Sequence, residues 1–281
     1  MTPASSTGLV ALLGNPVGQS VSPALHNAAF EDAGLDLVYI AARVSGPRFR
    51  EAATGLHALG ALGANVTVPH KRAAWNLAEA LGPMAAAAGA VNTLVRTPTG
   101  WSGHNTDVEG FAKPLRETNV DLRDARALVI GAGGAARAAV LALRDGFGLS
   151  RIDVAARRTE QAGALVEDLA SGGNAGLRAV ALGDADTRAR LVVNATPVGM
   201  HDAAEMPYPG AQFTPDQVVY DLVYGPERTR LVHAARAAGA TTLDGLAMLI
   251  GQAAGSFQLW TGREMNTDLA MRVARDALAA R

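Results

Sequence analysis

The chain alternates short apolar runs with longer alanine-rich stretches along nearly its whole length. Short apolar runs predict strands and the stretches between them predict helices, an alternation typical of α/β proteins with parallel sheets. The predicted strands cover residues 9–14, 36–43, 63–68, 90–94, 127–131, 152–156, 191–195 and 218–223, and the chain after Asp244 is predicted to be almost entirely helical.

Two predicted helices help to divide the chain. One begins at Ser22-Pro23, with Ser22 as N-cap and the proline in the first helical position. The other, over 108–119, connects two sets of strands. We therefore expect an N-terminal α/β domain over 1–109, completed by 246–281, and a Rossmann-like parallel-sheet domain over 110–245.

Composition narrows the classes of protein that this chain can represent. Its 281 residues are enough for two cores, and 49% hydrophobic with 18% charged residues is typical of a globular enzyme. A net charge of -1 gives no basic field for nucleic acid. Cysteine is absent, which excludes disulfides and thiolate metal sites, and we expect no bound metal. No apolar run is long enough for a signal peptide or a membrane helix, so a cytoplasmic protein is expected.

A glycine-rich turn follows the predicted strand 127–131. The segment Gly131-Ala132-Gly133-Gly134-Ala135-Ala136 fits the pattern G-x-G-x-x-G/A between a strand and a helix. Small residues let the backbone approach a pyrophosphate, and the helix N-terminus supplies free N–H groups. A tight turn alone would also need glycine, but the following strand favours a dinucleotide site.

The next strand of that domain ends at Arg157-Arg158-Thr159. NAD-binding domains usually place an acidic residue here to hold the ribose hydroxyls. A guanidinium instead pairs with a 2′-phosphate, so the cofactor is predicted to be NADP. The simpler alternative is a solvated arginine pair at the start of a helix.

Polar residues interrupt the apolar strands of the first domain. Asn65 and Thr67 are expected to share one face of the strand 63–68, and Lys71 follows where open α/β sheets bind ligands. Asn92 lies in the predicted strand 90–94, and Asp107 ends a polar turn over 103–107. These groups together predict a site for a hydroxylated ligand, whereas each alone is compatible with a polar sheet edge or an ordinary turn.

Lysine is rare in this chain and its position is therefore informative. Of 25 basic residues, 23 are arginine and two are lysine, Lys71 and Lys113. Lysine can donate a proton during catalysis, whereas arginine effectively cannot. Lys71 is thus a candidate proton donor, and Lys113, in the predicted connecting helix, receives no role.

The ordered motifs resemble the shikimate dehydrogenase family. They begin with Ser20-Val-Ser22-Pro-Ala-Leu-His26 and continue with Asn65-Val-Thr67-Val-Pro-His-Lys71, Gly89-Ala-Val-Asn92-Thr93, Gly103-His-Asn105-Thr-Asp107, Gly131-Ala-Gly133-Gly134, Asn194-Ala-Thr196-Pro-Val-Gly199-Met200, Tyr220-Asp221-Leu-Val-Tyr224 and Asp244-Gly245-Leu-Ala-Met248-Leu-Ile-Gly-Gln252. The match covers nearly the whole chain, so it is far more specific than the glycine turn alone.

The resemblance implies a two-domain enzyme that reversibly reduces 3-dehydroshikimate to shikimate with NADPH, in aromatic amino-acid (chorismate) biosynthesis. It implies that Lys71 and Asp107 are catalytic. The substrate would be held by Ser20, Ser22, Asn65, Thr67, Lys71, Asn92, Asp107, Tyr224 and Gln252. The cofactor would be held by Gly131, Ala132, Gly133, Gly134, Ala135, Arg157, Arg158, Thr159, Thr196, Leu222, Gly245 and Met248.

Two positions depart from the family pattern, and several alternatives stay open. Arg157 replaces the usual asparagine before Arg158, and Ala247 replaces a common glycine. A quinate/shikimate or aminoshikimate dehydrogenase that uses NAD or NADP would share most of these motifs. A non-catalytic ligand-sensing protein on the same fold is disfavoured by the presence of both Lys71 and Asp107, and a methylene-folate dehydrogenase by the Ser-x-Ser-Pro motif. A monomer or a homodimer is expected.

Overall fold

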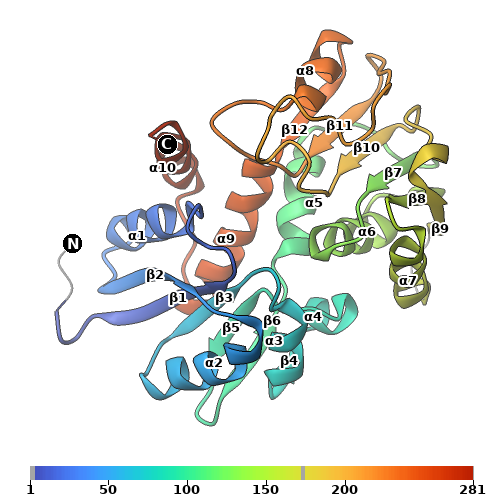
Figure 1. The fold of residues 1–281 in the computed structure, drawn as a ribbon. Helices are drawn as coiled ribbons and strands as arrows, with labels where there is room; N and C mark the ends of the chain where they lie inside the picture. Colours follow the sequence, from blue (N-terminus) through green and yellow to red (C-terminus); the bar gives the residue numbers. More distant parts are fainter. Residues whose placement is uncertain (1–3, 172–174, 281) are drawn as a thin grey trace. The chain divides into compact units, whose positions relative to one another are not determined.

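The structure is a computed structural model that describes residues 4–171 and 175–280. The chain forms two compact units, each with its own sheet (Figure 1). The first unit comprises the chain up to Thr106 together with the chain from Ile250 onward, and the second comprises Asp107–Leu249. The α/β class is confirmed in both units.

The sheet of the first unit is mixed, with the strand order β2-β1-β3-β5-β6-β4. β1 pairs in parallel with β2 and β3, whereas β5 pairs antiparallel with both β3 and β6. The carboxyl ends of β1, β3 and β6 and the amino end of β5 therefore meet at one edge. The strands are β1 (Gly8–Gly14), β2 (Leu37–Arg43), β3 (Gly63–Val66), β4 (Ala80–Leu81), β5 (Thr93–Arg96) and β6 (Trp101–His104).

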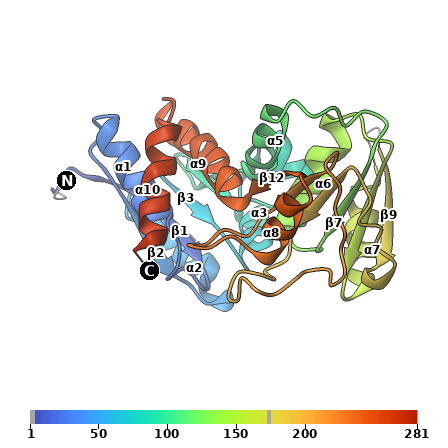
Figure 2. The same cartoon turned by 90° about the horizontal axis from the view of Figure 1, so that it is seen from above.

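Helices pack on this sheet and bring distant parts of the chain together. α10 packs against α1, so the last helix of the chain lies beside the first (Figures 1 and 2). Of the two helices that follow Asp244, α9 is more apolar than α10. The helices are α1 (Ser22–Asp32), α2 (Phe49–Ala58), α3 (Lys71–Leu77), α4 (Pro83–Ala88), α9 (Gly245–Thr261) and α10 (Thr267–Ala279), with a short 3-10 turn at η1 (Gly46–Arg48).

His26 lies at the centre of an aromatic cluster in the first unit. Its ring stacks on Tyr39 with centroids 4.5 Å apart and lies 5.4 Å from Trp260. The side chain is fully buried, and neither ring nitrogen has a hydrogen-bond partner among the described residues. Burial without a partner penalises the charged imidazolium and lowers the pKa of His26 from 6.5 to about 3.

We expect the His26→Phe variant to lose stability less steeply than the wild type as the pH falls. The folded protein keeps His26 neutral, whereas the unfolded chain binds a proton below pH 6.5. Between pH 6.5 and about pH 3, protonation of His26 in the unfolded state therefore lowers the free energy of unfolding of the wild type by about 1.4 kcal/mol for each pH unit. Urea unfolding at several pH values measures the difference, and parallel stability curves for the two proteins would contradict it.

The second unit has a fully parallel sheet with the order β12-β11-β10-β7-β8-β9. Counted outward from β7, this is the strand order of Rossmann folds. β7, β8, β10 and β11 are almost wholly buried, as expected for parallel strands covered on both faces. The strands are β7 (Arg126–Ile130), β8 (Arg151–Ala156), β9 (Gly176–Ala181), β10 (Leu191–Asn194), β11 (Val218–Asp221) and β12 (Thr241–Asp244).

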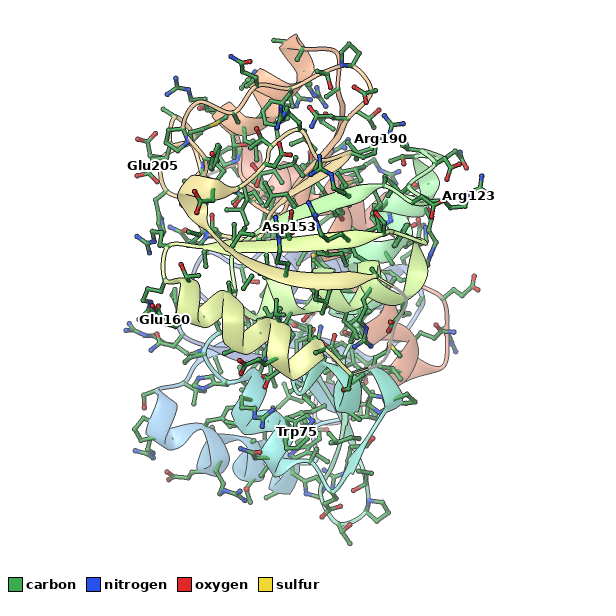
Figure 3. All side chains as sticks on the ribbon, turned by 90° about the vertical axis from the view of Figure 1, so that its right-hand side faces the viewer. Trp75, Arg123, Asp153, Glu160, Arg190 and Glu205 are labelled. Carbon is green, nitrogen blue, oxygen red and sulfur yellow. The ribbon has the colours of Figure 1, made fainter. Side chains whose placement is uncertain are left out.

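The helices of the second unit connect these strands. α6 packs on β7 and β8, α7 on β8 and β9, and α8 on β11 and β12. Asp153 of β8, labelled in Figure 3, is buried opposite Arg178 of β9, and their side chains form an ion pair of 2.9 Å. The helices are α5 (Asp107–Glu117), α6 (Gly134–Gly146), α7 (Thr159–Leu169) and α8 (Arg230–Ala237), with a 3-10 turn at η2 (Leu182–Asp184).

The prediction that Ser22 is the N-cap of the first helix is wrong. Val21 is the N-cap, and Ser22 is the first residue inside α1. Ser20 takes over part of the capping role, because its Oγ accepts a hydrogen bond from the backbone N–H of Ser22 at 3.2 Å.

Three predicted boundaries in the first unit also need correction. β3 ends at Val66, because Thr67–His70 forms a turn closed by the His70 N–H and the Thr67 carbonyl at 2.8 Å. Asn92 lies just before β5 and not within a strand, because its side chain bonds the backbone N–H of Thr106. The predicted polar turn over 103–107 is divided between β6, which ends at His104, and α5.

Within the described ranges, no helix combines the length and the apolar composition needed to cross a lipid bilayer.

Candidate functional site

Predicted substrate residues of the first unit gather at one edge of its sheet. Ser20 and Ser22 follow β1, Thr67 and Lys71 follow β3, and Asn92 precedes β5. The mixed sheet explains this grouping, because an antiparallel strand begins at the edge where its parallel neighbours end. Positions far apart in the sequence are thus brought to one place by strand direction.

Close packing at Gly14 brings the end of β1 against Thr67. A Cβ atom on Gly14 would lie 2.2 Å from Cγ2 of Thr67 and 2.8 Å from Cγ1 of Val17, so a larger residue would force these side chains to shift. The backbone N–H of Thr67 donates to the Leu13 carbonyl at 2.9 Å. Thr67 is half-buried and therefore keeps part of its side chain accessible.

Lys71 is the first residue of α3 and is held through its neighbour His70. Nε2 of the buried His70 lies 2.8 Å from the Val44 carbonyl oxygen, and its ring stacks on Phe49 at 4.8 Å. The Lys71 carbonyl accepts the backbone N–H of Val91 at 3.0 Å, which fixes the start of α3 beside the segment that carries Asn92. The Lys71 side chain is half-buried.

Hydrogen bonds decide which end of the Asn92 amide faces which partner. Its Oδ1 accepts the backbone N–H of Thr106 at 2.8 Å and the hydroxyl of Thr93 at 3.0 Å. A backbone N–H can only donate, so this end must be the oxygen. The Nδ2 atom then donates to Oγ1 of Thr106 at 2.9 Å and lies 3.5 Å from Oε1 of Gln252 on α9.

The Asn65 side chain forms hydrogen bonds with other residues of the first unit. Its Oδ1 accepts the hydroxyl of Tyr39 at 2.8 Å, and its Nδ2 donates to Oγ of Ser256 at 2.9 Å. The same nitrogen lies 3.2 Å from the Asn92 carbonyl oxygen, and the residue is 5% exposed. These bonds give Asn65 an internal role that the sequence prediction did not include.

Two other predicted substrate residues belong to the second unit. Asp107 is the first residue of α5 and is buried. Tyr224 follows β11 and is half-buried. Each therefore lies next to the carboxyl end of a strand, which is the usual position for site residues in α/β proteins.

The crevice for a dinucleotide in a Rossmann sheet lies where the strand order reverses, here between β7 and β10. Gly131 follows β7 with φ +122, and a Cβ atom there would lie 2.7 Å from the Ala195 carbonyl oxygen after β10. The two loops thus meet at backbone distance. Thr196, a predicted cofactor residue, lies in the loop that Gly131 contacts.

Buried polar side chains hold the Thr196 loop in place. Oδ1 of Asn194 accepts the backbone N–H and the hydroxyl of Thr196 at 3.0 and 2.7 Å. Nδ2 of Asn194 donates to the carboxylate of Asp221 at 2.8 Å. Burial raises the pKa of Asp221, although bonds from Thr229, Val223 and Asn194 oppose that rise. Neither Asn194 nor Asp221 was predicted to be a site residue, although each ends a buried apolar strand.

The start of α6 fits a pyrophosphate group. Its N-cap is Gly133, which supplies no side-chain bond to the free N–H groups of the first turn. Gly133 and Gly134 are exposed, and a Cβ atom on Gly133 would meet no atom within 4 Å. Free N–H groups facing open space at a helix N-terminus are a suitable anion site.

Arg157 and Arg158 follow the carboxyl end of β8, as the glycine turn follows the carboxyl end of the parallel strand β7. Thr159 begins α7, and Figure 3 labels Glu160 beside it. All three side chains are exposed. Within the described part of the chain, neither guanidinium takes part in a salt bridge. The pair is therefore available for a phosphate on a cofactor bound at the crevice.

The beginning of α9 packs tightly on the loop after β11. A Cβ atom on Gly245 would lie 2.0 Å from the Leu222 carbonyl oxygen, and the Gly245 N–H donates to the Val223 carbonyl at 3.2 Å. Met248 is buried one turn later. The predicted cofactor residues Leu222 and Gly245 are thus neighbours.

We expect alanine at Gly131 and at Gly133 to fail in different ways. Gly131→Ala should lower the melting temperature, because its φ of +122 and its contact with the Ala195 carbonyl oxygen leave no room for Cβ. Gly133→Ala should leave the melting temperature unchanged, because its φ of -85 suits alanine, and should weaken NADPH binding. Thermal unfolding and NADPH titration measure the two effects, and equal losses of stability in both variants would contradict the assignment.

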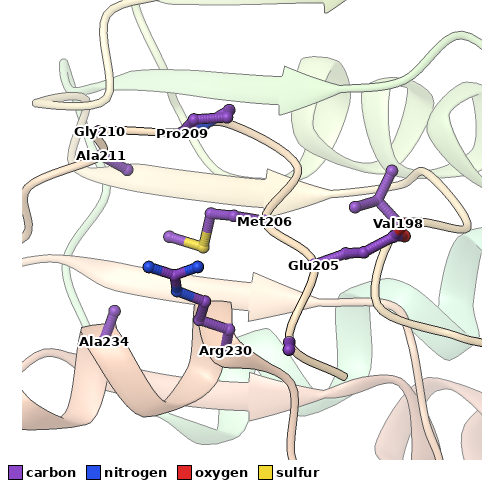
Figure 4. Close-up of a pocket in the computed structure, with 9 residues that line it drawn as sticks. Val198, Glu205, Met206, Pro209, Gly210, Ala211, Arg230 and Ala234 are labelled. Carbon is purple, nitrogen blue, oxygen red and sulfur yellow. The ribbon is translucent and has the colours of Figure 1, made fainter. Parts of the chain in front are cut away.

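A hollow of about 630 Å³ lies elsewhere in the second unit (Figure 4). It lies between the loop after β10 and α8, and the Arg230 side chain lies beside Met206. None of the predicted site residues lines it. Over 4–171 and 175–280, no cluster of His, Cys, Asp or Glu is arranged to hold a metal ion.

The family models and the known relatives that match this chain all point to one family. Residues 12–94 match the shikimate dehydrogenase substrate binding domain, and residues 245–275 match the shikimate 5'-dehydrogenase C-terminal domain. A shikimate dehydrogenase (NADP(+)) from Moorella thermoacetica is 45% identical, over 98% of this chain and 95% of its own length.

Solved structures agree over nearly the full length. Shikimate 5-dehydrogenase from Thermus thermophilus, in complex with NADP(H) and shikimate, has a TM-score of 0.87 and 38% identity, and the match covers 96% of this chain and 100% of that one. Quinate dehydrogenase from Corynebacterium glutamicum, in complex with NAD, has a TM-score of 0.87 and 34% identity, with 95% and 98% covered. Taken with the paired sheets and the ordered motifs, these matches establish that the chain belongs to the shikimate dehydrogenase family.

Proposed function

We propose that this protein is an NADP-dependent shikimate dehydrogenase, which reversibly reduces 3-dehydroshikimate to shikimate in the route to chorismate and the aromatic amino acids. The observation that carries the proposal is the 45% identity over 98% of the chain to a shikimate dehydrogenase (NADP(+)). The absence of cysteine fits a reducing compartment, and the cytoplasm is the expected location.

Lys71 is the proposed proton donor. When bound, NADPH supplies the hydride that converts the ketone carbon of the substrate into the alcohol carbon. Lys71 Nζ would give a proton to the ketone oxygen as that oxygen gains negative charge, and in the reverse direction it would accept the proton of the hydroxyl. The His70 contact with Val44 and the Val91 bond to the Lys71 carbonyl hold the base of this side chain in position.

Asp107 is the proposed partner of Lys71 in catalysis. A buried carboxylate beside the substrate can accept a substrate hydroxyl and stabilise a neighbouring ammonium group. The remaining substrate contacts fall to hydroxyl and amide groups, which suit a carboxylate and several hydroxyls. These are Ser20, Ser22, Thr67, Asn92, Tyr224 and Gln252, with Asn65 placed behind them by its internal bonds.

The cofactor residues divide by the part of NADP that they would hold. The α6 N-terminus with Gly131, Ala132, Gly133, Gly134 and Ala135 suits the pyrophosphate. Arg157, Arg158 and Thr159 suit the 2′-phosphate. Thr196, Leu222, Gly245 and Met248 are proposed near the nicotinamide.

A turnover panel tests the function. The purified protein is assayed with shikimate and with quinate, each with NADP+ and with NAD+. We expect shikimate with NADP+ to give the highest kcat/KM. The likeness to a quinate dehydrogenase in complex with NAD makes quinate with NAD+ the specific competitor, and a higher kcat/KM for that pair would replace the proposal.

A further inference from the structure

Two fully buried hydroxyl groups connect the inside of the first unit to its proposed substrate residues. Thr93 at the start of β5 and Ser256 on α9 are both 0% exposed, and their hydroxyl oxygens lie 2.8 Å apart. Ser256 lies within the largely apolar helix α9, where a buried polar side chain must find partners. The pair lies between Asn65 and Asn92.

Thr93 acts on the oxygen end of Asn92. Its Oγ1 donates to Oδ1 of Asn92 at 3.0 Å, beside the backbone N–H of Thr106 at 2.8 Å. With two donors on the oxygen, rotation of the amide by 180° would place N–H against N–H and O–H donors. The Nδ2 end is therefore kept toward Gln252, whose Oε1 lies 3.5 Å away.

Ser256 holds Thr93 in a fixed position relative to α9. Its Oγ accepts Nδ2 of Asn65 at 2.9 Å. Its single proton is therefore left for the Gln252 carbonyl oxygen at 3.0 Å, for Oγ1 of Thr93 at 2.8 Å or for Oγ1 of Thr106 at 3.2 Å. Asn65 is itself fixed by the Tyr39 hydroxyl on Oδ1. The network thus runs from Tyr39 through Asn65 and the hydroxyl pair to Asn92 and to the turn of α9 that carries Gln252.

We propose that Thr93 and Ser256 are positioning residues for substrate binding, which hold Asn92 so that it presents an N–H donor to an oxygen of the substrate. The inference rests on the proposed function, because it assigns Asn92 to the substrate site. Neither hydroxyl touches the substrate in this account. Their effect is transmitted by the orientation of one amide.

Thr93→Val is the sharpest test, because valine keeps the shape of threonine and removes only the hydroxyl. Loss of one buried hydrogen bond that orients the amide should raise the KM for shikimate about ten-fold. The kcat should change less than about three-fold and the KM for NADP+ should stay constant, because in this account the Asn92 amide binds the substrate and does not itself transfer the proton. Thr93→Ser restores the hydroxyl and should restore the KM. Ser256→Ala should raise the KM for shikimate in the same way.

Thr261→Ala is the matched control. Thr261 lies on the same helix and donates to the carbonyl four residues earlier at 2.8 Å, as Ser256 does, but it lies outside the network. It should leave both KM values unchanged. The double variant Thr93→Val/Ser256→Ala should raise the KM no more than either single variant, because both act through Asn92.

Three outcomes would overturn the inference: an unchanged KM in folded Thr93→Val, an equal rise in Thr261→Ala, or multiplying effects in the double variant. If Ser256→Ala does not fold, Thr93→Val and Thr93→Ser still decide the question. Failure of the proposed function is seen separately in the wild type, which would then have a higher kcat/KM for quinate with NAD+ than for shikimate with NADP+, or no turnover of shikimate.

Discussion

Replacement of Lys71 by alanine is expected to lower turnover of shikimate by about 10²–10⁴-fold, the usual effect of removing a general acid. Lys71→Arg is expected to fail nearly as badly, because arginine keeps the charge but does not release its proton at working pH. Both variants should fold and bind shikimate, since Lys71 is half-buried and its backbone bond to Val91 does not depend on the side chain. Steady-state kinetics with shikimate and NADP+ measure the loss, and calorimetry measures binding.

Lys113 provides the matched control for this prediction. It is the other lysine of the chain, lies exposed on α5 and pairs with Glu117 one turn later. Lys113→Arg and Lys113→Ala should retain full turnover, because an exposed pair of this kind contributes little. Near-normal turnover in Lys71→Arg would show that the charge of Lys71, and not its proton, is what the reaction needs.

The second large effect concerns the choice of cofactor. We expect the double variant Arg157→Ala/Arg158→Ala to lose most of its preference for NADPH while its use of NADH stays nearly constant. Charge-assisted bonds to a phosphate contribute about 1.5–3 kcal/mol each. Two such bonds set an upper range of about 10²- to 10⁴-fold, and the exposure of both arginines moves the expected value to the lower end.

The single variants separate the two arginines. Arg158→Ala is expected to have the larger effect, because Arg158 holds the arginine position of the family pattern and Arg157 replaces an asparagine. Raised salt should reduce the wild-type preference, because the interaction is ionic. The measurement is the ratio of kcat/KM for NADPH to that for NADH, at low and at high salt.

Arg123 is a suitable control for the arginine variants. It is exposed, pairs with Asp121 and lies at the other end of the second sheet from the first turn of α7 (Figure 3). Arg123→Ala should leave the cofactor ratio unchanged. A wild-type enzyme that used NADH as well as NADPH would contradict this assignment and would favour the quinate-type alternative.

Much of the second unit was predictable because its signals are local. β7, β8, β10 and β11 were expected within one or two residues, since parallel strands covered on both faces are continuous apolar runs. The glycine turn after β7 and the arginines after β8 could likewise be recognised from the sequence. β9 and β12 were not predicted, because as edge strands they are only partly buried and lack such runs.

The first unit was harder to predict because its sheet is mixed. Asn92 was expected inside a strand and Ser22 at a helix cap, and both predictions were wrong. The Asn92 side chain accepts the backbone N–H of Thr106, a partner outside its own strand, whereas Ser22 lies inside α1 and Val21 is the cap. Local propensity describes the backbone around a residue and carries no information about such partners.

The sequence by itself determined the class of fold, the glycine turn at Gly131, the arginines that favour NADP and the candidate proton donor Lys71, because each depends on residue type and local spacing. Only the tertiary structure decided that Asn65 is turned inward, that Asn92 presents its nitrogen to Gln252, and that Thr93 and Ser256 meet. These pairings depend on strand direction and on the return of α9 to the first unit's sheet, which join residues up to 191 positions apart. Hydrogen bonds between such distant side chains are set by the packed fold and leave no periodic signal in the chain.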